Sequence, residues 1–244
     1  MTIFKDQVAV ISGGGTGMGK AIALKLSAQG AKVYILGRNL ENLLSVKNNS
    51  ETIAGEIIPH QMDITEDAEI EKFKGQIENN WGRVDLLIHS AGIITLGNIK
   101  TTPVEDFDKQ YRTNVRAPYV LTQALLPMLI SSQGQIVVIN STAGLNAAKA
   151  GVSQYAATKH ALKAFTDSLR AEVNPQGVRV ISVYPGRTAS PMQAKIYEME
   201  GRGEAYNPQG LMQAEDIADV AINALALPKT AEVTDIQVRP MMKS

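Results

Sequence analysis

Short apolar runs alternate with longer helical patterns along this chain, and this alternation limits its possible folds more than any other feature. Polar residues do not recur at every second position of the runs, which indicates strands buried on both faces of a parallel sheet. Helical segments between such strands provide the crossovers that parallel pairing requires. We therefore expect an α/β fold: a three-layer, doubly wound (Rossmann) fold with a mainly parallel, seven-stranded sheet. The expected strands are Val8–Ser12, Lys32–Leu36, Glu56–Ile58, Val84–His89, Gln135–Asn140, Val178–Val183 and Val233–Val238.

The helical patterns fall between these runs, and no linker, internal repeat or low-complexity tract divides the chain. We therefore expect residues 1–244 to form a single domain that contains every functional site of the chain. The expected helices are Lys20–Leu26, Asn39–Asn49, Glu66–Asn80, Val104–Ile130, Ser153–Val173 and Ala214–Leu227.

The segment Thr188–Met212 interrupts the alternation, because it is rich in glycine and yet carries large apolar side chains. It follows a strand, so it should emerge at the carboxyl edge of the sheet, where open α/β folds bind ligands. We interpret it as a mobile lid over a substrate; the alternative is a surface loop with some local packing. Its basic residues Lys195 and Arg202 stand apart in the sequence, and its methionines and tyrosines indicate an apolar or mixed substrate.

Composition excludes several classes of function. The chain has 24 basic and 24 acidic residues, so its formal net charge is zero and nothing favours nucleic acid or an anionic membrane as a partner. Cysteine is absent and the three histidines lack metal-ligand spacing, so we expect no metal site. No run approaches the ~18 apolar residues of a membrane span, and the first residues lack a secretory signal's apolar region. We expect a cytoplasmic protein.

A glycine-rich turn, Ser12–Gly19 (SGGGTGMG), joins the first strand to the first helix. Glycines permit a tight turn with the backbone close to a ligand, and a helix N-terminus attracts phosphate. The turn therefore indicates a pyrophosphate site. At the end of the second strand, Gly37 stands where an acidic residue would bind the NAD ribose, and Arg38 follows. An arginine there suits the 2′-phosphate of NADP, so we favour NADP and leave NAD possible.

Tyr155 and Lys159 are four residues apart in an expected helix, so both side chains lie on one face. A cation beside the phenol favours the phenolate, and we expect the pKa of Tyr155 to lie below its usual value of roughly 10. Such a phenol can exchange a proton near neutral pH. The alternative is a surface tyrosine and lysine that merely share a helix face.

Together these stretches resemble the short-chain dehydrogenase/reductase family over essentially the whole chain. Ser12–Gly19 resembles the family's Thr-Gly-x-x-x-Gly-Ile-Gly, and Tyr155-x-x-x-Lys159 matches its active-site pair. Further matches are the serine-bearing segment Asn140–Gly144, the helix asparagine Asn114, Pro185-Gly186 beside the nicotinamide, and Asp63 near the adenine.

The resemblance implies hydride transfer between a nicotinamide and a carbonyl or alcohol, and it assigns the residues. Catalysis would fall to Asn114, Ser141, Tyr155 and Lys159, and substrate contact to Ser141, Tyr155 and Met192. The residues expected to bind the cofactor are Gly13, Gly15, Thr16, Gly17, Met18, Gly19, Arg38, Asp63, Ala91, Gly92, Tyr155, Lys159, Pro185, Gly186 and Thr188.

The interpretation we favour is an NADPH-dependent reductase of ketones or 3-oxoacyl-type compounds. A catalytically silent NADP-binding sensor or scaffold is the alternative, and a nucleotide-sugar epimerase or dehydratase is a third. Family habit suggests a homo-oligomer, a tetramer or a dimer.

Three departures from the family pattern remain. His89-Ser90-Ala91-Gly92 replaces Asn-Asn-Ala-Gly, so His89 must replace the first asparagine's hydrogen bonds or they are lost. Ser141 lies fourteen residues before Tyr155 where thirteen is commoner, and Thr142 would satisfy thirteen; the Ser-x-x-Gly pattern through Gly144 favours Ser141. Thr16 stands at a position that is often basic in NADP-using members.

Overall fold

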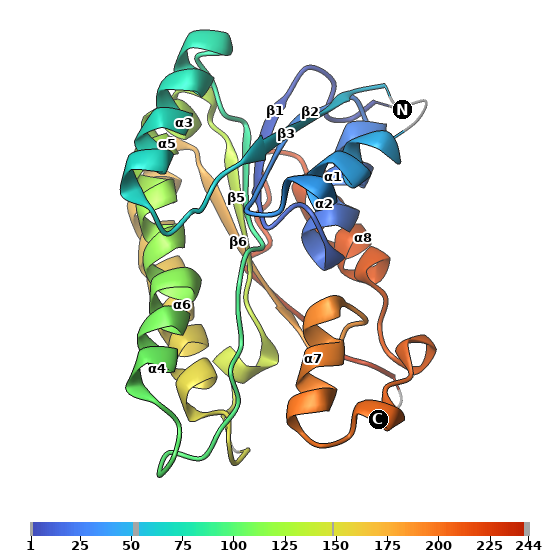
Figure 1. Ribbon diagram of the computed structural model, residues 1–244. Helices are drawn as coiled ribbons and strands as arrows, with labels where there is room; N and C mark the ends of the chain where they lie inside the picture. The colour runs from blue at the N-terminus through green and yellow to red at the C-terminus, as the bar shows by residue number, and fades with distance from the viewer. Residues whose placement is uncertain (1, 51–53, 148, 242–244) are drawn as a thin grey trace.

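Seven strands form one sheet in the computed structural model, which describes residues 2–50, 54–147 and 149–241 (Figure 1). Their order is β3-β2-β1-β4-β5-β6-β7, and every neighbouring pair is parallel, so the predicted doubly wound sheet is confirmed and is wholly rather than mainly parallel. The strands are β1 Val8–Ser12, β2 Lys32–Gly37, β3 Glu56–Gln61, β4 Leu86–His89, β5 Gln135–Ile139, β6 Arg179–Pro185 and β7 Asp235–Val238.

The chain reverses its direction of travel across the sheet between β1 and β4. β1 pairs with β2 on one side, with Ala9 opposite Val33, and with β4 on the other, with Ala9 opposite Leu86. The first half of the chain runs outward from β1 to β3, and the second half runs the other way from β4 to β7. A crevice opens at such a switch point, outside the carboxyl ends of the strands.

Helices cover both faces of the sheet, which gives the expected three layers (Figure 1). One layer contains α1 (Gly17–Ala28), α2 (Leu40–Asn48) and α8 (Ala214–Leu225). The other contains α3 (Asp67–Asn80), α4 (Val104–Tyr111), α5 (Ala117–Ser132) and α6 (Ser153–Val173). In the described part of the chain, no helix is long and apolar enough to cross a membrane.

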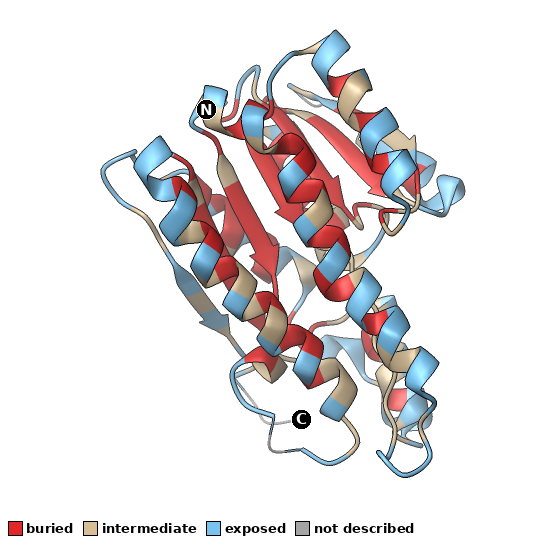
Figure 2. Ribbon diagram, turned by 90° about the vertical axis from the view of Figure 1, so that its left-hand side faces the viewer, coloured by how far each residue is buried: buried red, intermediate tan, exposed pale blue. Residues whose placement is uncertain are grey.

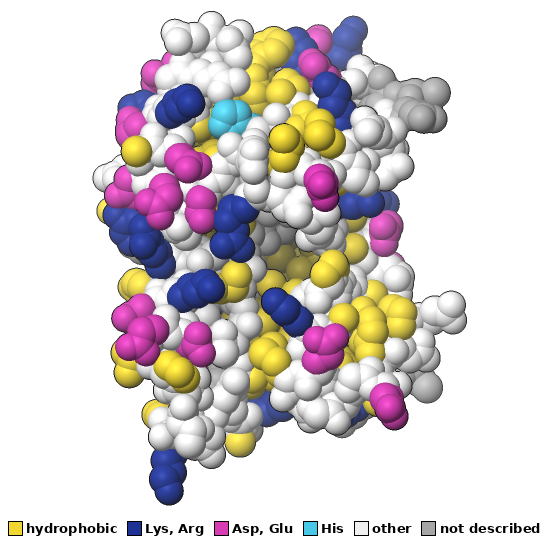
Figure 3. Space-filling view, in the orientation of Figure 1, with side chains coloured by type: hydrophobic (Ala, Val, Ile, Leu, Met, Phe, Trp, Pro, Cys, Tyr) yellow, Lys and Arg dark blue, Asp and Glu magenta, His cyan; other side chains and the backbone are white. Residues whose placement is uncertain are grey.

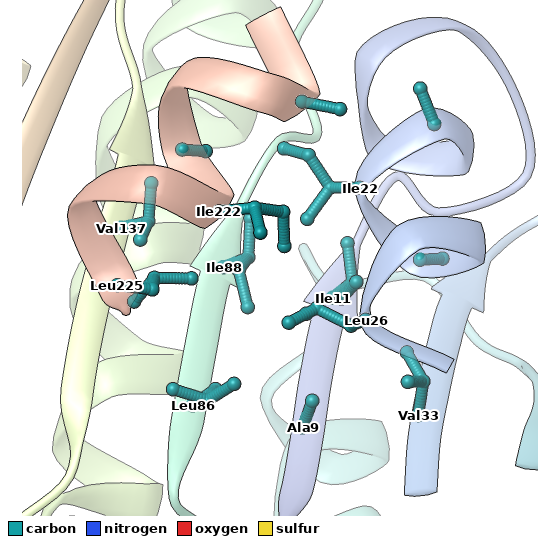
Figure 4. Packing of buried hydrophobic residues seen from close by; sticks show 14 of the residues in the cluster. Ala9, Ile11, Ile22, Leu26, Val33, Leu86, Ile88, Val137, Ile222 and Leu225 are labelled. Atoms are coloured by element: carbon teal, nitrogen blue, oxygen red, sulfur yellow. The ribbon is translucent and has the colours of Figure 1, made fainter. Parts of the chain in front are cut away.

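Alternating side chains of the strands build two separate cores, one on each face. In β1, Ala9 and Ile11 are buried against α1 and α8, whereas Val8 and Val10 belong to the cluster under α3, α5 and α6. Figure 4 shows the first core, to which β1 contributes Ala9 and Ile11 and α1 contributes Ile22 and Leu26. Figure 2 shows the second layer, where buried stripes of the helices face buried strands. Burial on both faces explains the continuous apolar runs of the sequence.

The expected helix Val104–Ile130 is wrong as one element, because a π-helical turn, η1 (Arg112–Arg116), separates α4 from α5. Ala117 donates its backbone N–H to the carbonyl of Arg112, five residues back. Pro118 has no N–H to donate to the carbonyl of Asn114, so the α-helical pattern cannot continue unchanged through this point. The wide turn places Asn114 at the junction of the two helices.

The segment Thr188–Met212, interpreted as a lid and assigned no helix from the sequence, contains a helix, α7 (Pro191–Met199). The Ser190 side chain accepts a hydrogen bond from the Gln193 N–H at 3.1 Å, and Pro191 occupies the first turn, which are both strong helix-start signals. Thr188 and Met212 form a parallel bridge at the base of the segment. Figure 1 shows α7 below the sheet, away from the two helical layers.

Candidate active site

Two cavities that share wall residues lie at the carboxyl edge of the sheet. The larger has a volume of about 710 Å³ and the smaller about 170 Å³, and Met18, Ser190 and Met192 line both. Figure 3 shows the hollow on this face of the molecule, with an apolar floor and basic side chains on its rim. The crevice expected at the switch point is therefore present.

The larger cavity contains most of the residues expected to bind a cofactor. It also reaches Arg112, Lys109 and Ser90, which the sequence analysis did not assign. Gly19 does not line the cavity but is buried beneath it. The predicted residues that line it are Gly13, Gly15, Thr16, Gly17, Met18, Arg38, Asp63, Ala91, Gly92 and, at its junction with the smaller cavity, Met192.

The glycine turn packs too tightly for side chains at three positions. A Cβ on Gly13 would lie 2.7 Å from the Ala91 backbone, one on Gly14 would lie 2.7 Å from the Ile35 side chain, and one on Gly19 would lie 2.3 Å from the Gly13 carbonyl oxygen. Gly17, which opens α1, has φ of +53°. Thr16 occupies the N-cap of α1 without a side-chain capping bond, so N–H groups of the first turn remain available to an anion. These features fit a pyrophosphate.

Arg38 and Asp63 face each other across the far end of the larger cavity. Arg38 Nη1 lies 4.0 Å from Asp63 Oδ2, and the Arg38 side chain is 67% exposed. The Asp63 carboxylate accepts hydrogen bonds from the backbone and the hydroxyl of Thr65 at 2.9 and 2.8 Å. Although burial raises it, these bonds and the nearby arginines hold the pKa of Asp63 below its ordinary value. Asp63 is therefore a carboxylate held in place by Thr65, and Arg38 is an exposed cation beside it.

The smaller cavity contains the residues expected beside the reacting atoms. Ser141 and Tyr155 line it, and so does Thr142, the alternative to Ser141. Thr188 is buried in its wall, and Met192 adjoins both cavities. Asn114 and Lys159 do not line either cavity; both are buried behind the walls. The remaining predicted residues that line it are Pro185 and Gly186.

Ser141 and Tyr155 are neighbours in the lining of the smaller cavity. Ser141 caps the short helix η2 (Thr142–Gly144) by accepting from the Ala143 N–H at 3.1 Å, which fixes its position after β5. Burial raises the pKa of the Tyr155 phenol above its ordinary value, and the nearby Ser141 hydroxyl opposes that shift only in part. The expected lowering of the Tyr155 pKa is therefore wrong for the protein without a bound cofactor, since burial is the largest effect on this group.

Lys159 is buried without an anionic partner among the described residues. Lys159 is only 4% exposed, and its Nζ donates a hydrogen bond to the carbonyl of Ile139 at 3.2 Å. Burial lowers its pKa to about 8. Nζ lies 5.8 Å from the centre of the Tyr155 ring, so the two side chains share one helix face as predicted.

The Asn114 side chain connects the loop after β4 to α6 through hydrogen bonds. Its side-chain nitrogen donates to the Ile93 carbonyl at 2.9 Å and to Thr158 Oγ1 at 3.1 Å, and its oxygen accepts from the Ile93 N–H at 2.8 Å. A Cβ on Gly92 would lie 3.4 Å from Asn114 Oδ1 and 4.0 Å from Lys159 Nζ. The side chain of Asn114 is thus engaged in holding the loop beside Lys159.

His89 makes only some of the hydrogen bonds that an asparagine at this position would make. Its Nε2 lies 2.8 Å from Thr122 Oγ1, while its buried Nδ1 has no hydrogen-bond partner in the described structure. Burial lowers the pKa of His89 to about 3, so the ring is neutral. The Ser12 hydroxyl instead holds the following loop, accepting from the Ser90 and Ala91 N–H groups at 3.3 Å each.

A charged cluster borders the smaller cavity and was missed by the sequence analysis. Arg187, Lys149 and Glu200 line the cavity, and Glu200 forms ion pairs with Lys149, with Arg187 at 3.3 Å and with Arg202 at 3.6 Å. Although burial raises it, Lys149 and Arg187 hold the pKa of Glu200 below its ordinary value. Arg202 is therefore not isolated. Arg187 lies between the predicted Gly186 and Thr188, and that adjacency was the available signal.

The tight packing of the glycine turn predicts opposite effects for two Gly→Ala substitutions in helices. We expect Gly19→Ala to weaken dinucleotide binding and to destabilise the fold by roughly 1–3 kcal/mol, because its methyl group meets backbone. Gly75→Ala in α3 meets nothing within 4 Å and should stabilise by roughly 0.5–1 kcal/mol. Denaturant unfolding and dinucleotide titration measure both, and equal stability changes for the two variants would contradict the packing argument.

The buried ammonium of Lys159 predicts a pH-dependent stability. Its pKa is about 8 in the folded protein against 10.5 ordinarily, so between these values the unfolded chain binds more protons and stability rises with pH. In cofactor-free protein, Lys159→Met should therefore stabilise at pH 7 by roughly 1–3 kcal/mol. This advantage should shrink from about pH 8 upward. Thermal unfolding of both proteins at pH 7 and pH 10 measures it; a constant difference would show that burial does not penalise the charge.

The sequence matches a family model described as short chain dehydrogenase over residues 7–201. A similar curated protein is an uncharacterized oxidoreductase of Staphylococcus aureus (strain USA300). It is 34% identical over 244 residues, and the match covers 99% of this chain and 100% of that protein.

Solved structures agree with the sequence comparison. A metagenomic short-chain oxidoreductase in complex with NADP has a TM-score of 0.83 and 29% identity, with 99% of this chain and 100% of that chain covered. The closed form of a serine dehydrogenase complexed with NADP⁺ has a TM-score of 0.88 and 26% identity, with 98% and 96% covered. With the Tyr155–Lys159 pair, the glycine turn and the parallel sheet in place, the chain belongs to the short-chain dehydrogenase/reductase family of enzymes.

Proposed function

We propose that this enzyme is an NADPH-dependent reductase of small carbonyl compounds. The observation that carries the proposal is the placement of Ser141 and Tyr155 together in the lining of a small cavity that shares wall residues with the dinucleotide cleft. The Tyr155 phenol is protonated at neutral pH and can donate its proton to a developing alkoxide, and the buried Lys159 beside it would favour that transfer by stabilising the tyrosinate.

The larger cavity fits a dinucleotide by its backbone donors and its charge. The uncapped first turn of α1 would hold the pyrophosphate, and Asp63 would lie near the adenine. Arg38 would bind a 2′-phosphate, since no acidic side chain occupies position 37 to bind a free ribose hydroxyl. The structural relatives complexed with NADP support this choice of cofactor, and NAD remains the alternative.

When bound, the nicotinamide supplies a hydride to the carbonyl carbon of the substrate. Ser141 would donate a hydrogen bond to the carbonyl oxygen as negative charge develops there, and Tyr155 would transfer its proton to that oxygen. The carbonyl group is thereby reduced to an alcohol. The Lys159 ammonium would stabilise the tyrosinate that remains. Because pH 7 lies below the Lys159 pKa of about 8, this group is mainly charged at neutral pH.

Asn114 would help return the proton to Tyr155. Its side chain is engaged by Ile93 and Thr158, but its backbone carbonyl lacks an α-helical donor because of Pro118. We propose that this carbonyl holds a water beside Lys159. Pro185, Gly186 and Thr188 would flank the nicotinamide.

The volume of the smaller cavity favours a small substrate. Its roughly 170 Å³ is less than the ~300–1,000 Å³ of sites for larger ligands, which supports short ketones over long 3-oxoacyl chains. Met192 would contact substrate at the junction of the cavities. We further propose that the whole chain acts as one domain, with residues 188–212 as its lid.

We also propose a homo-oligomer, a dimer or a tetramer, that works in the cytoplasm. Its support is large apolar side chains that remain exposed on α4 and α5. Val104, Tyr111 and Tyr119 are 68%, 47% and 52% exposed.

The proposed acid predicts a selective loss of catalysis. Tyr155→Phe should lower kcat for carbonyl reduction by about 10²–10⁴-fold, because the proton donor is removed. The Kd for NADPH should change little, since the ring remains. Tyr34→Phe is the matched control: it removes a hydroxyl that accepts a hydrogen bond from Trp81 Nε1 and lines neither cavity, so both values should stay unchanged. Substantial residual turnover in Tyr155→Phe would overturn the acid assignment; no turnover by the wild type with any carbonyl, despite tight NADPH binding, would favour a silent sensor.

The proposed phosphate contact predicts a change in cofactor preference. Arg38→Ala should raise the KM for NADPH by about tenfold or more and leave the KM for NADH nearly unchanged, because only NADPH carries the 2′-phosphate. Arg116→Ala removes an arginine outside the larger cavity and serves as the control. An unchanged NADPH-to-NADH preference in Arg38→Ala would refute the assignment.

A further inference from the structure

The wall of the smaller cavity contains hydrogen-bond donors that the protein itself leaves unused. Arg187 Nη1 and Gln193 Nε2 are both buried, and neither has a hydrogen-bond partner in the described structure. Both residues line the cavity that Ser141 and Tyr155 also line. Gln193 is only 6% exposed. Buried donors are normally satisfied, and two unsatisfied ones beside one cavity indicate a missing acceptor.

The charge around these donors also indicates that an acceptor, and specifically an anion, is missing. Lys149, Arg187 and Arg202 all pair with one carboxylate, Glu200, which leaves an excess of positive charge beside the cavity. The contacts of Arg187 to Glu200 are long, at 3.3 and 3.5 Å from Nη2, and leave Nη1 unbonded. An arginine held in this way retains capacity for a second anion.

Arg187 is also held in place from behind. Its guanidinium carbon lies 5.0 Å from the centre of the Tyr197 ring, and Tyr197 in turn packs against Tyr206 with ring centres 5.4 Å apart. Gln193 and Tyr197 belong to α7, whereas Arg187 follows β6 directly. The donors therefore come from both the sheet edge and the segment proposed as a lid, so an anion bound between them would join the two.

We infer that the substrate carries a carboxylate, bound by Arg187 and Gln193 in the smaller cavity, so that the enzyme acts on short oxo acids and the corresponding hydroxy acids. The inference rests on the proposed reductase function for its chemistry. A planar carboxylate matches the arginine fork and suits a cavity of about 170 Å³. The carbonyl of the same molecule would face Ser141 and Tyr155, while the carboxylate meets the unpaired donors.

The test compares short oxo acids with their methyl esters, which differ in charge but keep the same carbonyl. The panel is 2-oxobutanoate, 3-oxobutanoate and 4-oxopentanoate, because the distance between carboxylate and carbonyl is set by the cavity. Binding to the enzyme loaded with NADP⁺ is measured by calorimetry, where an oxo compound and an oxidised cofactor cannot react. Reduction with NADPH is measured in parallel as kcat/KM.

For at least one acid, we expect wild-type enzyme to bind the acid at least tenfold more tightly than its ester. Arg187→Met should reduce the acid-to-ester ratio by about 10- to 100-fold, the range for one lost hydrogen bond to a charged group. Gln193→Leu should reduce it less, and Arg187→Lys should restore it in part. Arg202→Met is the matched control: it also removes a partner of Glu200, but Arg202 does not line the cavity, so the ratio should stay near the wild-type value.

Two results would overturn the inference: equal binding of every acid and its ester by the wild type, or equal changes of the ratio in Arg187→Met and Arg202→Met. The latter would show that Arg187 acts only through Glu200. Reduction of esters without any acid preference would refute the carboxylate site and leave the reductase proposal intact. Selective binding of an acid without turnover of any carbonyl would support the site and refute the reductase proposal.

Discussion

Parallel pairing of all seven strands is the constraint on which the rest of the structure depends. It sends every carboxyl end to one edge of the sheet, and the reversal between β1 and β4 opens the crevice there. The glycine turn after β1, the loop after β4 and the serine after β5 therefore meet although they are far apart in the chain. Ser12 connects the first two directly, since its hydroxyl accepts from two N–H groups of the loop after β4.

Burial then determines the protonation of the groups gathered at that edge. It raises the pKa of the Tyr155 phenol, lowers that of Lys159 to about 8 and keeps His89 neutral. In each case removal of solvent disfavours the charged form, and no nearby opposite charge among the described residues cancels the effect. The phenol is thereby kept in the form that donates a proton, while the ammonium is buried close enough to respond to charge on the ring.

Much of the fold was predictable because two-sided burial leaves a direct record in the sequence. The bounds of β1 and of α6 agree with the expectation, and the remaining strands differ from it by a few residues at their ends. The errors have local causes. Pro118 interrupts the expected helix Val104–Ile130 because it has no N–H to donate to the carbonyl four residues earlier. The helix α7 was not predicted because the segment that contains it is rich in glycine. The lowered pKa expected for Tyr155 failed because spacing gives proximity to Lys159 but not the extent of burial.

Apolar periodicity and short motifs are local properties of the chain, and they were enough to predict the fold class, the glycine turn and the candidate site residues Ser141, Tyr155 and Lys159. How these residues are solvated and which charges surround them could be learned only from the folded structure. The cluster of Lys149, Arg187, Glu200 and Arg202 is an example: its members come from a loop before α6, the end of β6 and the end of α7. Ion pairs and unpaired donors depend on distances across the fold, and no spacing along the chain encodes those distances.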